Sequence, residues 1–262
     1  AGNAAVIKPP RETPLTALRI GELLHEAGVP AGVVNIVPTL TSGAWFDAAV
    51  DHPATRMVSF TGSTEVGIVL LKRAADRVLK TVMELGGNAP FIVFDDADLE
   101  AAVQGAMVAK MRHSAETCTA ANRFFVHAAV AEDFTKMFAA AMADVRIGSG
   151  FDDGVTCGPM INAKAVASII ELVTAAADHG ATIATGGGSV DGPGHFYPPT
   201  VLGNVRSGDE ITRHEIFGPV APVITFDDTD QVIADANDTE MGLTGYVYTR
   251  DLRRGLAVSE RI

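Results

Sequence analysis

The sequence predicts an α/β fold with a largely parallel sheet. Short apolar segments of strand length alternate with longer segments of helical period along the whole chain. The helical segments are long enough to connect parallel strands, which antiparallel hairpins do not need. The 262 residues are 47% hydrophobic, which is enough for one large domain or two modest ones with packed cores.

The chain begins with a predicted βαβ unit. A strand over residues 4–7, a helix that runs to about residue 27 and a strand over 33–37 follow one another. Thr13 is expected to cap this helix, and Pro14 is expected in its first turn because proline suits the start of a helix.

A second strand–turn–helix unit predicts an anion site. The strand over 57–60 runs into a turn of small residues that contains Gly62 and Ser63, and a helix follows to about residue 79. Backbone N–H groups and the positive end of the helix dipole meet at such a turn, which suits a phosphate. The turn has neither of the common phosphate-loop patterns, so an ordinary helix capped by Ser63 or Thr64 is an equal alternative.

The other expected elements complete the alternation. Helices are expected over 43–50, 99–113, 129–145, 163–179, 229–237 and from 253 to the end, and strands over 79–83, 90–94, 123–126, 181–184, 200–202, 222–226 and 244–248. The glycine pair at 86–87 is the expected hinge, with domains over 1–86 and 87–262. The chain starts without Met and stops in an uncapped helix, so we expect a fragment whose C-terminal end is missing.

Composition argues against several partners. The net charge is -12, and no basic stripe is present, so nucleic acid is not expected. No apolar run has the length of a membrane span. Two cysteines do not make a disulfide framework, which favours a reducing, cytoplasmic setting. The seven histidines are scattered, so no metal site is expected.

Two segments offer catalytic groups. Glu84 ends a predicted strand just before two glycines, and Cys118 lies on a loop of small and polar residues. A thiolate is a strong nucleophile and a carboxylate is a suitable base, so together they suggest nucleophilic catalysis. The plainer alternative is a surface glutamate beside a turn and a small, inert buried cysteine.

Four sequence words in order carry a family resemblance. They are Phe60-Thr61-Gly62-Ser63-Thr64-Glu65-Val66-Gly67, Glu84-Leu85-Gly86-Gly87-Asn88, Thr117-Cys118 and Glu215-Ile216-Phe217-Gly218-Pro219. As an ordered set, the words resemble the NAD(P)-dependent aldehyde dehydrogenase family over essentially the whole chain. The run from Asn88 to Asp98 is similar to the succinate-semialdehyde dehydrogenase branch.

The resemblance implies part of a Rossmann-type nucleotide-binding domain followed by an α/β catalytic domain. It implies that Cys118 attacks an aldehyde to form a thiohemiacetal, which is oxidised to a thioester, and that Glu84 activates the water for hydrolysis. Both groups would then have to approach one substrate carbon.

The resemblance also implies a cofactor site. Family members that prefer NAD carry Glu three residues after the lysine that corresponds to Lys8, whereas this chain has Arg11. A guanidinium there would attract a 2′-phosphate, so NADP is the expected cofactor and NAD a possible one. An unengaged, solvent-exposed Arg11 is the alternative. The implied cofactor-binding residues are Lys8, Arg11, Gly62, Ser63, Leu85, Glu215 and Phe217.

Arg112 carries the expected substrate preference. Lys110-Met111-Arg112 resembles a segment of the succinate-semialdehyde branch whose arginine binds the substrate's distal carboxylate. The alternative is a helix-end arginine paired with a nearby acid.

The chain departs from the commoner family pattern around the cysteine. Glu116 stands where glutamine is usual, and we expect its charge to point away from the thiol. His113 is too unreliable a partner to indicate a Cys/His hydrolase. Ala120 stands where some relatives have a second, redox-active cysteine, and Cys157 is expected to be buried.

The family's oxyanion asparagine and subunit-pairing arm would lie outside this chain, so the full-length protein is expected to be a homo-oligomer. A weakly active or inactive fragment of this fold and a cofactor-independent thiol esterase remain the alternatives to an aldehyde dehydrogenase.

Overall fold

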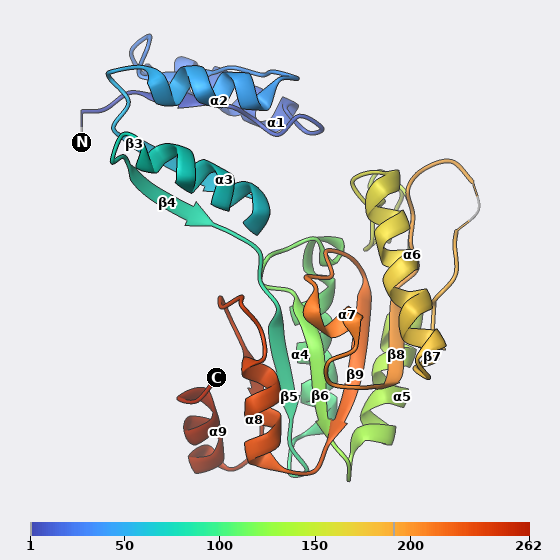
Figure 1. The fold of residues 1–262 in the computed structure, drawn as a ribbon. Helices are drawn as coiled ribbons and strands as arrows, with labels where there is room; N and C mark the ends of the chain where they lie inside the picture. The colour runs from blue at the N-terminus through green and yellow to red at the C-terminus, as the bar shows by residue number, and fades with distance from the viewer. Residues whose placement is uncertain (1, 191) are drawn as a thin grey trace. The chain divides into compact units, whose positions relative to one another are not determined.

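The computed structural model describes residues 2–190 and 192–262. It divides into two compact units, one up to Leu85 and one from Gly86 onward (Figure 1). The boundary predicted from the sequence lies one residue later, after Gly86.

The first unit contains two parallel strand pairs with helices. Its elements are β1 (Ala5–Ile7), α1 (Leu15–Glu26), β2 (Val34–Ile36), α2 (Ser42–Asp51), β3 (Met57–Thr61), α3 (Thr64–Ala75) and β4 (Lys80–Glu84). Strand β1 pairs with β2, and β3 pairs with β4, both in parallel. The buried core is small and consists of Val50, Val58 and Ala74, so most of the strand side chains are at least partly exposed.

Two predicted details of the first unit are wrong. Thr13 does not cap α1, because Pro14 occupies the N-cap with helical backbone angles and its own carbonyl accepts from Leu18. Helix α3 ends at Ala75 rather than near residue 79. The chain reverses there through Val78, whose φ is 51°.

The second unit is built on a six-stranded sheet. Its elements are β5 (Ala89–Val93), α4 (Leu99–Met111), the 3-10 turn η1 (Arg112–Ala115), β6 (Ala121–His127), α5 (Ala131–Ala143), α6 (Ala163–Asp178), β7 (Thr182–Thr185), β8 (Thr200–Val205), α7 (Glu210–Arg213), β9 (Val220–Phe226), α8 (Thr229–Asn237), β10 (Tyr246–Tyr248) and α9 (Leu252–Ser259). The strand order is β10-β5-β6-β9-β8-β7. All neighbours are parallel except β7, which runs antiparallel to β8 at the sheet edge.

Helices cover both faces of this sheet (Figure 1). All five residues of β5 are buried, which is expected of a parallel strand with two covered faces. Successive side chains along this segment pack against the helices on opposite faces of the sheet. Phe91 and Val93 pack with α4 and α5, whereas Ile92 and Phe94 pack with α6, α8 and α9.

The largest correction in the second unit concerns the end of α4. The sequence predicts a helix through His113, but α4 ends at Met111. His113, Ser114 and Ala115 then have φ of 54°, 56° and 66°, so the chain enters a left-handed turn that a continuing right-handed helix cannot contain.

Candidate active site

Residues from three of the four sequence words lie at one end of the strands of the six-stranded sheet. Gly86 and Gly87 come just before β5, Cys118 comes just before β6, and Glu215 comes shortly before β9. These strands are parallel neighbours, in the order β5-β6-β9, so their amino ends meet at the same edge. The second unit therefore gathers the glycine pair, the cysteine and the glutamate although more than 120 residues separate the first from the last.

Cys118 lies in a tight turn against Gly87. The thiol residue is partly exposed, and Ala120 N donates to Thr117 O at 3.0 Å across the turn. A Cβ atom at Gly87 would lie 2.4 Å from the Cys118 carbonyl oxygen. Only glycine therefore permits this approach between the cysteine turn and the segment before β5.

Glu215 contacts the same glycine pair. Gly87 N donates to Glu215 Oε1 at 3.2 Å, and a Cβ atom at Gly86 would lie 2.5 Å from Glu215 Oε2. Phe217, two residues further, is exposed with 44% of its surface accessible. The Glu215 carboxylate is thus held by the backbone of Gly87, the residue that the cysteine turn approaches.

A buried lysine lies beneath this arrangement. Lys110 Nζ donates to Asn122 Oδ1 at 3.1 Å and to Ile216 O at 3.4 Å. Asn122 Nδ2 in turn donates to Gly87 O at 3.3 Å. Burial lowers the pKa of the Lys110 ammonium to about 7, and the Glu215 carboxylate opposes that shift.

A buried arginine also binds the segment before β5. The Arg123 guanidinium donates to Asn88 O through Nε and Nη2, and to the carbonyls of Asp235 and Ala236 at the end of α8. Burial lowers the pKa of Arg123 to about 10. These bonds tie the start of β5 to β6 and α8.

The structural roles of Lys110, Asn122 and Arg123 are not among the predictions made from the sequence. One signal was available, because the helical period places Lys110 on the stripe of Ala102, Val103 and Ala106 that faces the core. A charged residue on a buried stripe needs polar partners, which predicts a network beneath it.

Arg112 lies close to the cysteine turn. Its side chain is exposed, and Nη2 donates to Thr119 Oγ1 at 3.0 Å. Thr119 O in turn accepts from Tyr246 Oη at 2.8 Å. The predicted substrate arginine is therefore bonded to the residue that follows Cys118.

Glu116 is bonded to a neighbouring loop. Its Oε1 accepts from Ile161 N at 3.2 Å, and burial raises the pKa of its carboxyl while this hydrogen bond opposes the rise. Cys157 is 1% exposed, as the sequence predicts, and burial raises the pKa of its thiol.

Within the first unit, Glu84 and the turn that contains Gly62 and Ser63 are neighbours. Glu84 is the last residue of β4 and pairs with Thr61, and Gly62 N donates to Glu84 O at 3.1 Å. Ser63 caps α3, with Oγ accepting from Val66 N. The predicted Ser63 cap is therefore present, and an anion site at this turn stays a prediction.

Leu85 packs on α3. A Cβ atom at Gly67 would lie 2.5 Å from Leu85 Cδ2, so glycine allows the helix to rest on this side chain. Lys8 is partly buried, and its Nζ donates to Pro9 O at 2.8 Å. Arg11 is largely exposed and forms an ion pair with Glu12 at 2.7 Å.

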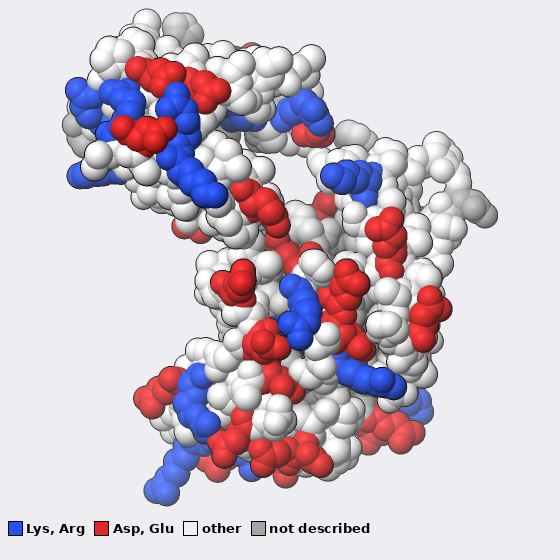
Figure 2. Space-filling model, in the orientation of Figure 1, with Lys and Arg blue, Asp and Glu red and all other residues white. Residues whose placement is uncertain are grey.

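Two further features were expected to be absent from the chain, a metal site and a membrane span, and residues 2–190 and 192–262 can be described for both. These residues contain no group of three or more His, Cys, Asp or Glu side chains placed to hold a metal ion, and none of their helices is both long and apolar enough to span a bilayer. On the face that Figure 2 shows, basic and acidic side chains are interspersed.

Comparisons with known proteins agree with the sequence words. A family model described as "Aldehyde dehydrogenase family" matches residues 1–262. A succinate-semialdehyde dehydrogenase of Paenarthrobacter nicotinovorans is 51% identical over 100% of this chain and 58% of its own length. A glutarate-semialdehyde dehydrogenase of Pseudomonas putida KT2440 is 44% identical over 100% of this chain and 54% of its own.

A solved structure shares the fold. The crystal structure of an NADP-dependent enzyme of E. coli matches with a TM-score of 0.96 and 45% identity, over 99% of this chain and 54% of that one. The chain thus spans about half the length of the relatives it matches.

Proposed function

Because this chain belongs to the aldehyde dehydrogenase family, we propose that its protein oxidises a carboxylate-bearing aldehyde to the acid with NADP or NAD. Succinate semialdehyde or a similar short aldehyde is the proposed substrate, which agrees with the names of two relatives. The observation that carries the proposal is the meeting of Gly87, Cys118 and Glu215 at the amino ends of three parallel strands.

Cys118 is the proposed nucleophile. Its thiolate adds to the aldehyde carbon, and the S–C bond gives a thiohemiacetal. Loss of a hydride from that carbon leaves a thioester on the sulfur. Glu84 then takes a proton from water, the water oxygen attacks the thioester, and the S–C bond breaks to release the acid and the thiolate.

Different residues of the chain are assigned to different parts of a bound dinucleotide. When bound, the cofactor supplies the acceptor for the hydride. Ser63 and Gly62 at the start of α3 suit its pyrophosphate, because helix N–H groups and the dipole favour an anion. We assign the adenosine ribose to Lys8, the 2′-phosphate to Arg11 and the nicotinamide side to Leu85, Glu215 and Phe217.

Arg112 is the proposed anchor for the distal carboxylate. Its guanidinium is exposed and lies one hydrogen bond from the residue next to the nucleophile. A planar guanidinium binds a carboxylate in a bidentate manner, so it selects aldehydes that carry one.

A spectrophotometric assay of the intact protein tests the proposal. Succinate semialdehyde with NADP is expected to produce the absorbance of the reduced nicotinamide, and Cys118→Ala is expected to abolish it. Arg112→Ala is expected to raise the KM for succinate semialdehyde at least about tenfold while a neutral aliphatic aldehyde is affected much less. Arg146→Ala is a matched arginine control.

Two results would contradict these assignments. Equal effects of Arg112→Ala on the KM for charged and neutral aldehydes would contradict the assignment of Arg112 to the distal carboxylate. Ester hydrolysis without any cofactor-dependent oxidation would favour a thiol esterase instead. A homo-oligomer and a cytoplasmic setting remain predictions for the full-length protein.

A further inference from the structure

The segment just before Cys118 contains backbone that must be held in place. His113, Ser114 and Ala115 are three consecutive residues with positive φ, and none of them is glycine. Each such residue is costly because its Cβ crowds the backbone, so the conformation persists only where the surroundings impose it. Two contacts from one neighbouring loop supply that constraint.

The neighbouring loop, residues 157–161, donates both hydrogen bonds. Gly158 N donates to Ser114 Oγ at 3.0 Å, and Ile161 N donates to Glu116 Oε1 at 3.2 Å. The two acceptors bracket Ala115, which is fully buried with 0% exposure. The left-handed turn is thus fastened on both sides of its most enclosed residue.

The loop 157–161 is itself anchored. Met160 N donates to His195 O at 2.8 Å, and the Met160 side chain is 4% exposed in the core cluster that includes Ile169. Cys157 is bonded through backbone to Arg146 and Gly148. A fixed loop can therefore set the position of a strained turn.

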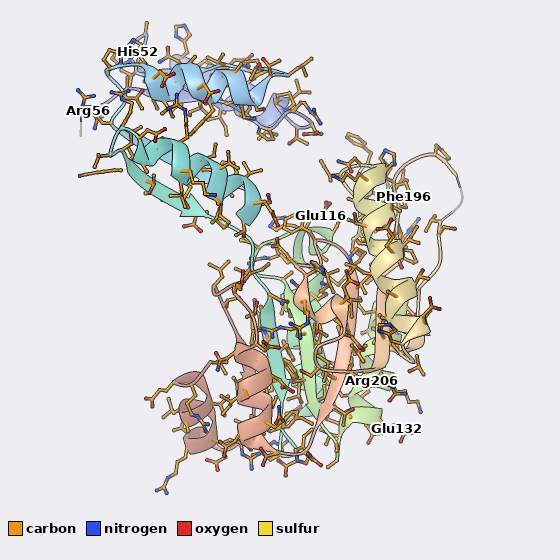
Figure 3. All side chains as sticks on the ribbon, viewed as in Figure 1. His52, Arg56, Glu116, Glu132, Phe196 and Arg206 are labelled. Carbon is orange, nitrogen blue, oxygen red and sulfur yellow. The ribbon has the colours of Figure 1, made fainter. Side chains whose placement is uncertain are left out.

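We propose that Glu116 is a positioning residue for Cys118, because its carboxylate fastens the left-handed turn to the loop 157–161. Glu116 is two residues from the nucleophile, so any freedom at Glu116 is transmitted to the thiol over a short stretch of backbone. Figure 3 shows Glu116 at the end of the sheet from which β5 and β6 begin. The inference rests on the proposed role of Cys118 as nucleophile.

The partial burial of the carboxylate supports this role. Glu116 is half-buried, and this burial raises the pKa of its carboxyl. Its charge also contributes to the raised pKa of Cys157, so the carboxylate lies close to the loop that it fastens.

Alkylation of the thiol tests the proposal in the intact protein. Iodoacetamide reacts with Cys118, and mass spectrometry of the Cys118 and Cys157 peptides gives a separate rate for each. Glu116→Ala removes the acceptor, whereas Glu116→Gln keeps an amide oxygen in the same place. Glu171→Ala, at an exposed glutamate of α6, is the matched control.

We expect Glu116→Ala to change the Cys118 alkylation rate and to lower kcat about tenfold or more, with a smaller change in the KM for the aldehyde. Glu116→Gln and Glu171→Ala are expected to stay close to the wild type in both. If the role of Glu116 were merely structural, Glu116→Ala would lower Tm, and Glu116→Gln would not restore kcat and the alkylation rate. Should Glu116→Ala not fold, Ser114→Ala removes the second acceptor and is expected to have the same effects in weaker form.

The proposal is overturned if Glu116→Ala alkylates and turns over like the wild type, or if Glu116→Gln fails as severely as Glu116→Ala. Failure of the proposed function is distinguishable, because alkylation needs neither aldehyde nor cofactor. If the wild type oxidises no aldehyde but the variants show the expected alkylation rates, the proposed reaction is contradicted and the positioning role of Glu116 is supported.

Discussion

At the scale of single residues, Lys110 is an ionisable group fully enclosed by protein. It is 0% exposed, and its partners are one amide oxygen and one backbone carbonyl. An enclosed ammonium loses its hydration, and these two acceptors replace only part of it. This loss of hydration lowers the pKa of the Lys110 ammonium to about 7 in the folded state, against an ordinary value of 10.5.

This difference predicts a pH-dependent stability. Between pH 7 and 10.5 the unfolded chain holds the Lys110 proton and the folded chain has released it, so the free energy of unfolding rises with pH over this window. The contribution is up to about 1.4 kcal/mol per pH unit. Urea unfolding at pH 7 and pH 9 is expected to show a larger gain for the wild type than for Lys110→Met.

Lys136→Met, at an exposed lysine of α5, is the matched control and is expected to keep the wild-type gain. The same gain in Lys110→Met would mean that Lys110 keeps its proton in the folded state across the window.

Arg11 carries the cofactor prediction at the same scale. Its guanidinium is exposed and paired with Glu12. A bound 2′-phosphate carries up to two charges, so it would be a stronger acceptor than Glu12 and would compete with it for Arg11. Arg11→Glu is expected to lower the ratio of kcat/KM for NADP to that for NAD by about tenfold or more. Arg19→Glu, on the exposed side of α1, is the control, and an unchanged ratio in Arg11→Glu would contradict the assignment.

At the scale of elements, the glycine pair before β5 decides how closely three segments approach. Gly87→Ala places a methyl group 2.4 Å from the Cys118 carbonyl oxygen, which is far inside van der Waals contact. Backbone must shift to relieve it, so we expect a loss of about 1–3 kcal/mol in stability and at least about a hundredfold loss in kcat. Thermal unfolding and the aldehyde assay measure the two effects.

Gly150→Ala is the matched control, because a Cβ atom there meets nothing within 4 Å. Wild-type turnover in Gly87→Ala would show that the approach of the cysteine turn to Gly87 is not needed for the reaction.

Element types could be predicted from the sequence far better than element ends. The buried strands β5, β6 and β9 follow from short apolar runs. The end of α4 could not be predicted, because nothing in Arg112–Ala115 signals a left-handed turn. The bonds that impose it come from residues more than 40 positions away.

At the scale of the whole molecule, the sequence words identify the residues but not the scaffold that brings them together. Cys118 and Glu215 are recognisable in the sequence, yet their common edge follows only from the strand order β5-β6-β9. The antiparallel edge strand β7 and the network under Gly87 likewise depend on contacts between distant segments.

The two units differ in how much core protects their strands. In the six-stranded sheet, β5, β6 and β9 have strands on both sides and helices over both faces, whereas β1 and β2 form an isolated pair with no buried residue. Hydrogen exchange followed by mass spectrometry is expected to be slowest in β5, β6 and β9 and markedly faster in β1 and β2. Equal protection of both sets would contradict this ranking.

The opposite edge of the six-stranded sheet, where β5, β6 and β9 end, carries none of the residues assigned to the reaction. The loop after β6 runs through Ala128 at this edge. A tether or fluorescent label attached near Ala128 would leave the amino ends of the strands untouched. Immobilisation on a solid support through this loop would therefore present the cysteine turn to the flowing substrate.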